Sequence, residues 1–223
     1  MDFKRARNDE QRSQRRRQIL DTAAAMLTEM PVAKLSLNEL SRRVGLAKPN
    51  VLRYFDSREA VLLQLLDAEL KDWIAELERS FQAGQGTPRE RGDRLAEILA
   101  ESMAQRPVLC DLLSAQAAVL EHNISTEVAI DHKHAALQSM RALARLALRH
   151  LPELGEDDAF RLVGATLFMA TAVWPCERPS EAVQAAYASA PVLAAMRPDF
   201  TDLIRQTVQL TASGLLARQE QHH

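Results

Sequence analysis

Residues 35–61 read LSLNELSRRVGLAKPNVLRYFDSREAV and place two short helical patterns on either side of a glycine. Ser36, followed three residues later by Glu39, forms the S-x-x-E capping box that opens a helix, and this helix is expected to run to about Val44. Gly45 then ends it, because glycine adopts the left-handed backbone conformation of a helix end at the lowest cost. The stretch therefore predicts a helix, a tight turn and a second helix.

The second short helix begins at Lys48 and Pro49 and is expected to end at Tyr54 or Phe55. Two helices that cross at a steep angle over a glycine turn need apolar side chains at the positions they share. Those positions hold Leu40, Val44, Leu46, Val51 and Tyr54. Ser41 is small where the two helices come closest. The pattern favours a DNA-binding helix-turn-helix, although an ordinary helical hairpin needs similar packing.

Helical patterns flank this unit on both sides. Apolar residues at three- and four-residue steps predict a helix over residues 15–30, and Asp56 or Ser57 caps a long helix that ends near Gly84. About 25 residues at 1.5 Å each span roughly 38 Å, enough to connect two domains. Further helices are expected over residues 89–105, 108–122, 125–151, 157–174, 181–190 and 198–219. The predicted fold class is all-α, with a three-helix helix-turn-helix domain joined by a long connector helix to a C-terminal helical bundle.

Charge divides the chain into two parts. Residues 1–60 carry 13 Lys and Arg against 8 Asp and Glu, whereas the whole chain has a net charge of −2. A basic segment on an otherwise acidic protein suits binding to a phosphate backbone, because Lys and Arg release counterions from DNA. A solvated N-terminal tail is the alternative. We expect a flexible basic arm over 1–12, a helix-turn-helix domain over 13–58 and a ligand-sensing and dimerisation domain over 59–223.

Several classes of protein find no support in the sequence. Cys110 and Cys176 lie far apart, which argues against a disulfide framework or a zinc cluster. His132 and His134 are two residues apart on an expected helix and so point in different directions, which argues against a metal site. Motifs of serine hydrolases, P-loop proteins, zinc proteases and dinucleotide-binding enzymes are missing. We therefore expect neither an enzyme nor a cofactor.

The expected location is the cytoplasm. The N-terminus shows no apolar core of a secretory signal. Charge-free stretches, such as the one that contains residues 162–174, are all shorter than the roughly 20 residues that cross a bilayer, so no contact with a membrane is expected.

The helix-turn-helix segment also resembles a known family. Residues 47–55 read AKPNVLRYF and residues 57–59 read SRE, which are similar to the S-K-x-x-L-Y-x-Y-F and S-K-E segments of the TetR/AcrR transcriptional regulators. The resemblance covers about residues 15–62, and beyond it only the helical layout is shared. Leu52 replaces a tyrosine that the family often has, and Pro49 replaces a residue that could donate a backbone hydrogen bond.

The resemblance implies which residues meet DNA. The helix from Lys48 to Tyr54 would enter the major groove, and Asn50 and Arg53 would read base edges, since Asn suits adenine and Arg suits guanine. The residues expected near phosphates are Ser36, Lys48, Tyr54 and Arg58, with added charge from Arg42 and Arg43. The full candidate DNA-binding set is Ser36, Arg42, Arg43, Lys48, Pro49, Asn50, Arg53, Tyr54 and Arg58. Tyr54 could instead pack in the core. Arg15, Arg16 and Arg17 could reach a minor groove or phosphates, but a flexible solvated arm is the default interpretation.

Two further sets of residues are expected in the C-terminal part. A dimer that reads a palindrome needs an interface elsewhere in the chain, and the resemblance implies that the last two long helices pair into a four-helix bundle. The candidate interface residues are Leu162, Ala165, Thr166, Met169, Phe200, Ile204, Thr207, Val208, Thr211 and Leu215. A mostly apolar effector pocket is expected from Trp73, Met103, Cys110, Leu113, Gln116, Leu120, Met140, Phe168 and Trp174. Both sets could equally be intramolecular core.

These observations predict a ligand-responsive transcriptional regulator that binds a palindromic operator as a homodimer. The resemblance implies a repressor, because most members of the family repress transcription. Its partners would be double-stranded DNA, a second copy of itself and a small-molecule effector. The alternative is a helical adaptor whose hairpin does not bind DNA. Salt-sensitive binding to duplex DNA separates the two, because phosphate contacts weaken steeply with salt.

Overall fold

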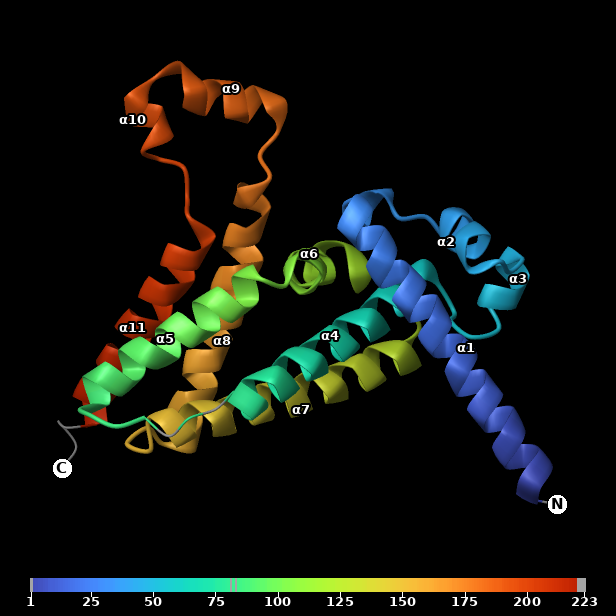
Figure 1. Ribbon diagram of the computed structural model, residues 1–223, viewed down its shortest axis with the longest axis horizontal. Helices are drawn as coiled ribbons and strands as arrows, with labels where there is room; N and C mark the ends of the chain where they lie inside the picture. The colour runs from blue at the N-terminus through green and yellow to red at the C-terminus, as the bar shows by residue number, and fades with distance from the viewer. Residues whose placement is uncertain (1, 81, 83, 220–223) are drawn as a thin grey trace. The chain divides into compact units, whose positions relative to one another are not determined.

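The computed structural model describes residues 2–80, 82 and 84–219, with side chains described from residue 10 onward (Figure 1). Within these residues the regular structure is entirely helical, which confirms the predicted all-α class. The chain divides into two compact units. The first comprises the chain up to Glu69 together with Ala115–Ala135, and the second comprises Leu70–Ser114 together with the chain from Ala136 onward.

The first unit contains the helix-turn-helix. Its elements are α1 (Asp2–Glu29), η1 (Val32–Lys34), α2 (Leu37–Val44), α3 (Lys48–Val51), the first half of α4 (Arg58–Ser80), the π-helical turn η2 (Gln116–Leu120) and the start of α7 (Thr126–His150). α1 buries one face of its C-terminal half at Ile19, Ala23, Met26 and Leu27. These four positions recur at three- and four-residue steps, as the sequence pattern predicts.

The expected packing of the two short helices is present. Leu40 and Val51 are fully buried, Val44 is nearly so, and Leu46 and Tyr54 are half-buried. Because these side chains come from both sides of the turn, they lock α2 and α3 into one small core. This shared core therefore holds the exposed residues on the outer face of the hairpin in place.

The turn between α2 and α3 follows the predicted chemistry. Ser36 accepts a 3.2 Å hydrogen bond from the backbone nitrogen of Glu39, which caps α2. Gly45 has φ 74° and ψ 30°, the left-handed conformation that ends the helix. The second half of the capping box differs from expectation, because the Glu39 carboxylate binds Arg42 and Arg43 instead of the Ser36 backbone.

Two helix boundaries in this unit differ from the sequence reading. α1 begins at Asp2 and not near Arg15, so the backbone of the segment expected as an arm is helical. The segment is rich in Arg and Gln, which favour helix even without an apolar face. α3 ends at Val51, earlier than expected, and a tighter turn continues to Tyr54, whose backbone nitrogen donates to the Val51 carbonyl oxygen.

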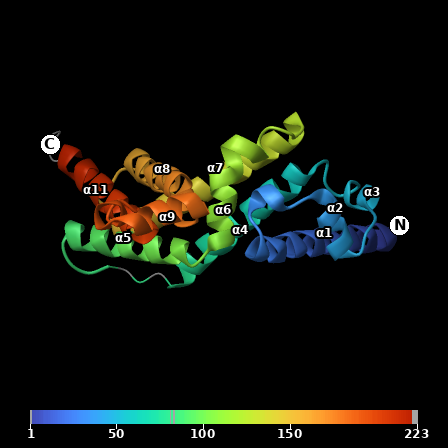
Figure 2. The same cartoon turned by 90° about the horizontal axis from the view of Figure 1, so that it is seen from above.

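The second unit is a helical bundle, as predicted. Besides the second halves of α4 and α7 it contains α5 (Pro88–Ala104), α6 (Pro107–Ala115), α8 (Glu156–Val173), η3 (Trp174–Glu177), α9 (Glu181–Ser189), α10 (Pro191–Ala194) and α11 (Phe200–Gln219). α11 packs against α5 and α8, and the three helices lie together in both views (Figure 2). α9 and α10 contact each other beyond the ends of α8 and α11 and bury none of their own residues (Figure 1).

The apolar character of α8 bears on the expectation that the chain makes no contact with a membrane. By length and composition alone, the segment Glu156–Glu177 would suffice to cross a membrane, although its charge-free stretch is short. In this unit the buried side of α8 packs against α11. A core helix passes the same length and composition test, which makes the finding weak evidence for a membrane span.

Candidate nucleic-acid interface

The polar face of α3 and the residues that follow it are exposed. Val51 points into the core with no exposed surface, and this anchor turns Lys48, Pro49, Asn50 and Arg53 outward to solvent. Of the candidate DNA-binding set, these four residues lie together on one short segment. A short helix with its polar residues free in this way has the shape that fits a DNA major groove.

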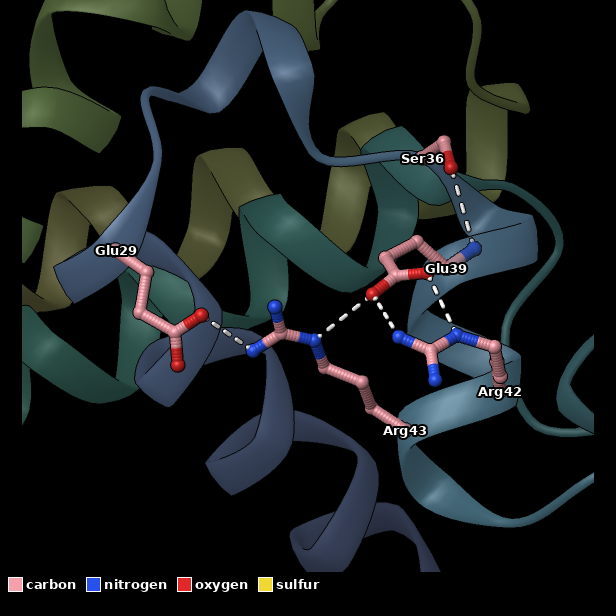
Figure 3. A network of polar contacts seen from close by, with 5 residues as sticks. All are labelled: Glu29, Ser36, Glu39, Arg42 and Arg43. Carbon is pink, nitrogen blue, oxygen red and sulfur yellow. Dashed lines mark hydrogen bonds and ion pairs between the residues drawn. The ribbon is translucent and has the colours of Figure 1, made fainter.

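Arg42 and Arg43 are engaged with carboxylates (Figure 3). Arg42 donates to both oxygens of Glu39, at 2.9 Å from Nε and 2.6 Å from Nη2. Arg43 donates from Nε to Glu39 at 3.0 Å and from Nη1 to Glu29 of α1 at 2.7 Å. The hydrogen bonds from Arg42 and then Arg43 lower the pKa of Glu39 to about 2. The charge expected from these two arginines is therefore balanced by two carboxylates.

Arg58 does not lie where the sequence places it. Its Nη2 donates to the backbone carbonyl oxygen of Val32 at 3.3 Å, and its Nε lies 3.7 Å from the carboxylate of Glu59. The side chain is only 22% exposed. In this conformation the guanidinium fastens the start of α4 to η1, and the phosphate contact of Arg58 stays a prediction. Ser36 is exposed, but its hydroxyl already caps α2.

A basic groove lies beside the recognition segment. It has a volume of about 1170 Å³ and joins one face of α1 to the residues that follow α3. Its walls are Gln11, Arg12, Gln14, Arg15, Arg17, Gln18, Asp21, Arg53 and Tyr54. The sequence analysis did not single out Arg12, and for Arg15 and Arg17 it gave a solvated arm as the default and contact with a minor groove or phosphates as the alternative. The missed signal is the spacing of Gln11, Arg15 and Gln18, which recur at three- and four-residue steps and so share one side of α1.

Arg16 differs from its neighbours because it turns inward. Its Nη1 donates to the carbonyl oxygen of Tyr54 at 2.5 Å, and its Nη2 donates to Gln64 of α4 at 2.6 Å. The guanidinium carbon lies 4.5 Å from the centre of the Phe55 ring. Burial, followed by the nearby charge of Arg12, lowers the pKa of Arg16. This residue therefore supports the recognition segment from behind.

The expected dimer interface is only partly accessible. Within the second unit, α8 and α11 bury Leu162, Thr166, Phe200, Ile204 and Val208 against their own chain. The apolar stripe of each helix is thus used to pack the bundle of its own chain, which is the alternative that the sequence left open for these five residues. Ala165, Met169, Thr207, Thr211 and Leu215 are half-buried.

The expected pocket is likewise mostly core. Trp73, Met103, Cys110, Leu113 and Trp174 are buried in the second unit, and Met140 is half-buried there. Gln116 and Leu120 belong to the first unit. Phe168 does not lie with these buried residues, because its side chain is 78% exposed on α8.

A different small cavity lies inside the second unit. Its volume is about 10 Å³, and of the predicted pocket residues only Trp73 lines it. Its other walls are Leu95, Leu99, Leu143, Leu146, Ala147, Leu162, Val163, Thr166 and Leu167. Trp73 donates from its indole nitrogen to the Ser102 hydroxyl at 3.0 Å, so the one polar edge of its ring is satisfied.

Comparison with protein families divides the chain in two. Residues 19–65 match the family described as bacterial regulatory proteins, tetR family. Residues 67–219 match the family described as tetracyclin repressor-like, C-terminal domain. The first match contains the helix-turn-helix, and the second contains most of the connector helix and the bundle.

Individual proteins show the same similarity. The HTH-type transcriptional regulator EthR of Mycolicibacterium smegmatis is 30% identical over 89 residues, which cover 40% of this chain and 41% of that relative's length. The crystal structure of a TetR transcriptional regulator from Rhodococcus sp. RHA1 aligns with a TM-score of 0.54 at 16% identity, covering 89% of this chain and 95% of the other. The transcriptional regulator FadR from Bacillus subtilis, in complex with stearoyl-CoA, aligns with a TM-score of 0.56 at 15% identity, covering 88% and 97%. At this identity the two structures show a shared fold.

Proposed function

Because the chain belongs to the TetR family, whose members are DNA-binding transcriptional regulators, we propose that it is a ligand-responsive repressor that binds a palindromic operator as a homodimer. The proposed cellular location is the cytoplasm, where the DNA target would lie. The observation that carries the proposal is the exposed polar face of α3, held outward by the buried side chain of Val51.

The recognition segment offers the right chemistry for reading bases. Asn50 suits the paired acceptor and donor of adenine, and Arg53 suits the two acceptors of guanine. Each good base contact contributes about 1–3 kcal/mol of discrimination. Lys48 would bind a phosphate next to them. Arg42 could join only by leaving the Glu39 carboxylate, so its contribution would be smaller than its exposed position suggests.

A homodimer would use the outer sides of α8 and α11. Phe168 on α8 is 78% exposed and Leu210 on α11 is 74% exposed. If these two side chains belong to one contiguous apolar patch, that patch has the character of an interaction surface. Gly214 has open space around it and would let a second helix approach closely. Sedimentation velocity should show a dimer for the wild type and a monomer for Phe168→Glu or Leu210→Glu, whereas Arg141→Glu, an exposed change on α7, should remain dimeric.

An effector would enter the second unit. The cavity beside Trp73 has room for about one water molecule, so a ligand of any size requires the surrounding helices to move apart. A ligand that binds only the opened form shifts the protein toward it. The stearoyl-CoA complex of FadR is a precedent for an acyl ligand on this fold. The leucine-rich walls of the cavity suit an apolar effector in the same way.

The direct test is selection of bound fragments from random duplex DNA at two salt concentrations. The wild type should enrich a palindrome, and the Asn50→Ala, Arg53→Ala double variant should lose or relax it. The Arg141→Ala, Arg145→Ala double variant, which removes two exposed charges from α7 in the second unit, should enrich the same palindrome as the wild type. Failure of the wild type to enrich any sequence would contradict operator binding and favour the adaptor.

A further inference from the structure

Helices α9 and α10 lie outside the packed core of the second unit. We call residues 181–196, which contain both helices, the arm. Neither helix buries a residue, and the two contact each other beyond the ends of α8 and α11 (Figure 1). α9 has 9 residues and α10 has 4, and helices of this length are marginal in water without tertiary packing. Their own chain therefore does not supply the packing that such short helices need.

The composition of the arm is unusual for an exposed segment. Residues 182–196 read AVQAAYASAPVLAAM and contain no charged residue. Val192 is 70% exposed, Met196 is 68% exposed, and Val183 is exposed as well. Charged residues are depleted at the buried centre of protein interfaces, and interfaces of homodimers are more apolar than those of other complexes. The arm therefore has the composition of an interface and not that of a solvated loop.

The two ends of the arm are anchored to the bundle. Trp174 in η3 donates from its indole nitrogen to the Asp111 carboxylate of α6 at 2.6 Å, and Arg178 donates to the other oxygen of that carboxylate at 3.0 Å. At the far end, the backbone nitrogen of Phe200 donates to the Glu177 carboxylate at 2.9 Å. The Phe200 and Trp174 rings meet edge to face, with their centres 4.9 Å apart. The arm thus leaves the bundle from a fixed base, which lowers the cost of ordering it in a complex.

The arm is continuous along the chain with the helices that the proposed homodimer uses. It follows α8 through η3 and leads into α11. Among the described side chains, the four most exposed large apolar ones are Phe168 on α8, Leu210 on α11, Val192 on α10 and Met196 just after α10. All four belong to the second unit. Because α8 and α11 would meet a second copy of the chain, the segment that joins them lies within reach of the same copy.

We infer that the arm is an interaction surface for a second copy of this chain, whose second unit covers its apolar residues. The inference rests on the proposed homodimer and adds to it a contact made outside α8 and α11. In a twofold dimer each copy would offer its arm to the other, so the contact would occur twice. A second copy suits the arm better than an occasional partner, because an uncharged apolar surface must be covered for as long as the protein is in solution.

The first measurement is the dissociation constant of the dimer, from sedimentation equilibrium. It compares the wild type, a Val192→Ser, Met196→Ser arm variant, and a Val119→Ser, Ile130→Ser control that removes exposed apolar side chains from the first unit. Each arm substitution removes an apolar side chain from both copies of the contact, so the dissociation constant should rise by more than about 10-fold. The control should keep the wild-type value. All four positions are exposed, and unchanged circular dichroism spectra would verify that the variants are folded.

The second measurement detects the contact directly. Photoreactive p-benzoylphenylalanine replaces Met196 in one variant and Ile130, an exposed residue of the first unit, in another. After irradiation of the purified proteins, a cross-link between two copies doubles the mass of the chain on a denaturing gel. The Met196 variant should give this product, with mass spectrometry locating the cross-linked peptide in the second unit of the other copy. The Ile130 variant should stay at the mass of one chain.

Failure of the inference and failure of the proposed homodimer give different results. If the wild type is a dimer, the arm variant keeps its dissociation constant and position 196 gives no product of doubled mass, the inference is wrong and the homodimer stands. Cross-links confined to a single chain would also overturn the inference, since the arm would then close over its own bundle. A wild type that stays monomeric at every concentration would contradict both.

Discussion

Arg16 of α1 donates a 2.5 Å hydrogen bond from Nη1 to the backbone carbonyl oxygen of Tyr54, 38 residues later in the chain. The same guanidinium also bonds Gln64 of α4 and covers the Phe55 ring. A single side chain thus connects the first helix, the end of the recognition segment and the connector helix. Its neighbours Arg15 and Arg17 are exposed and line the groove, so adjacent arginines on one helix have different surroundings.

Arg16→Ala should therefore destabilise the protein, whereas Arg15→Ala should not. Loss of two hydrogen bonds from a charged donor, together with the interaction over Phe55, is expected to cost about 2 kcal/mol. For a chain of this size the melting temperature should fall by roughly 4–8 °C. Thermal unfolding followed by circular dichroism measures the difference. Equal melting temperatures for the two variants would contradict the supporting role of Arg16.

Gly45→Ala should strain the turn between α2 and α3. The residue has φ +74°, and an added Cβ would meet no atom within 4 Å, so the expected loss comes from the backbone conformation alone. That conformation costs an L-residue about 1–2 kcal/mol. Gly45→Asn should lose less, because Asn tolerates the left-handed region. A melting temperature for Gly45→Ala equal to that of the wild type would show that the turn relaxes.

Glu39→Gln should change how stability depends on pH. The arginine pairs hold the pKa of Glu39 at about 2, below its ordinary value of 4.5, so the unfolded chain takes up the proton first as pH falls. The stabilisation is present above about pH 4.5 and disappears as pH falls toward 2. The melting-temperature difference between wild type and variant should be small, since exposed pairs contribute little, and should vanish at the acid end. A difference that stays constant from pH 2 to 7 would contradict this account.

His132→Ala should destabilise the first unit, and His134→Ala should serve as its control. His132 is 2% exposed, and its Nδ1 lies 2.9 Å from an Asp67 oxygen on α4, whereas His134, on the same helix, is exposed. Removing the imidazole takes a hydrogen-bond partner from Asp67 and one of two partners from Gln116, which keeps its bond to Glu121, at an expected cost of about 1–3 kcal/mol. The His134 change should stay within about 0.5 kcal/mol. Urea midpoints compare the two, and similar midpoints would argue against a structural role for His132.

The two cysteines should react at very different rates. Burial, with a smaller contribution from Asp111, raises the pKa of Cys110 to about 12, whereas Cys176 is exposed. At pH 8 a thiol reagent should therefore modify one cysteine per native chain and the second only after denaturation. Cys176→Ser should remove the fast phase. If both cysteines of the native protein were modified in the fast phase, the helix that carries Cys110 would have to open readily.

The sequence predicts local features of this protein well because they depend on nearby residues. Helix spacing, the cap at Ser36 and the turn at Gly45 all follow from chemistry within about four residues, and all three are present. The family signature lies in the same stretch, so the sequence also indicates the TetR family.

Tertiary structure decided which surfaces remain available. An apolar stripe has the same appearance in the sequence whether its partner is the same chain or a second copy, so Leu162 went into the core while Phe168 stayed outside. Long cationic side chains reach partners far along the chain: Arg43 binds Glu29, and Arg58 binds the carbonyl of Val32. The position of an arginine in its helix determines where its side chain starts. Only the neighbours in the folded chain determine whether the guanidinium contacts a carboxylate, a carbonyl oxygen or solvent in the groove.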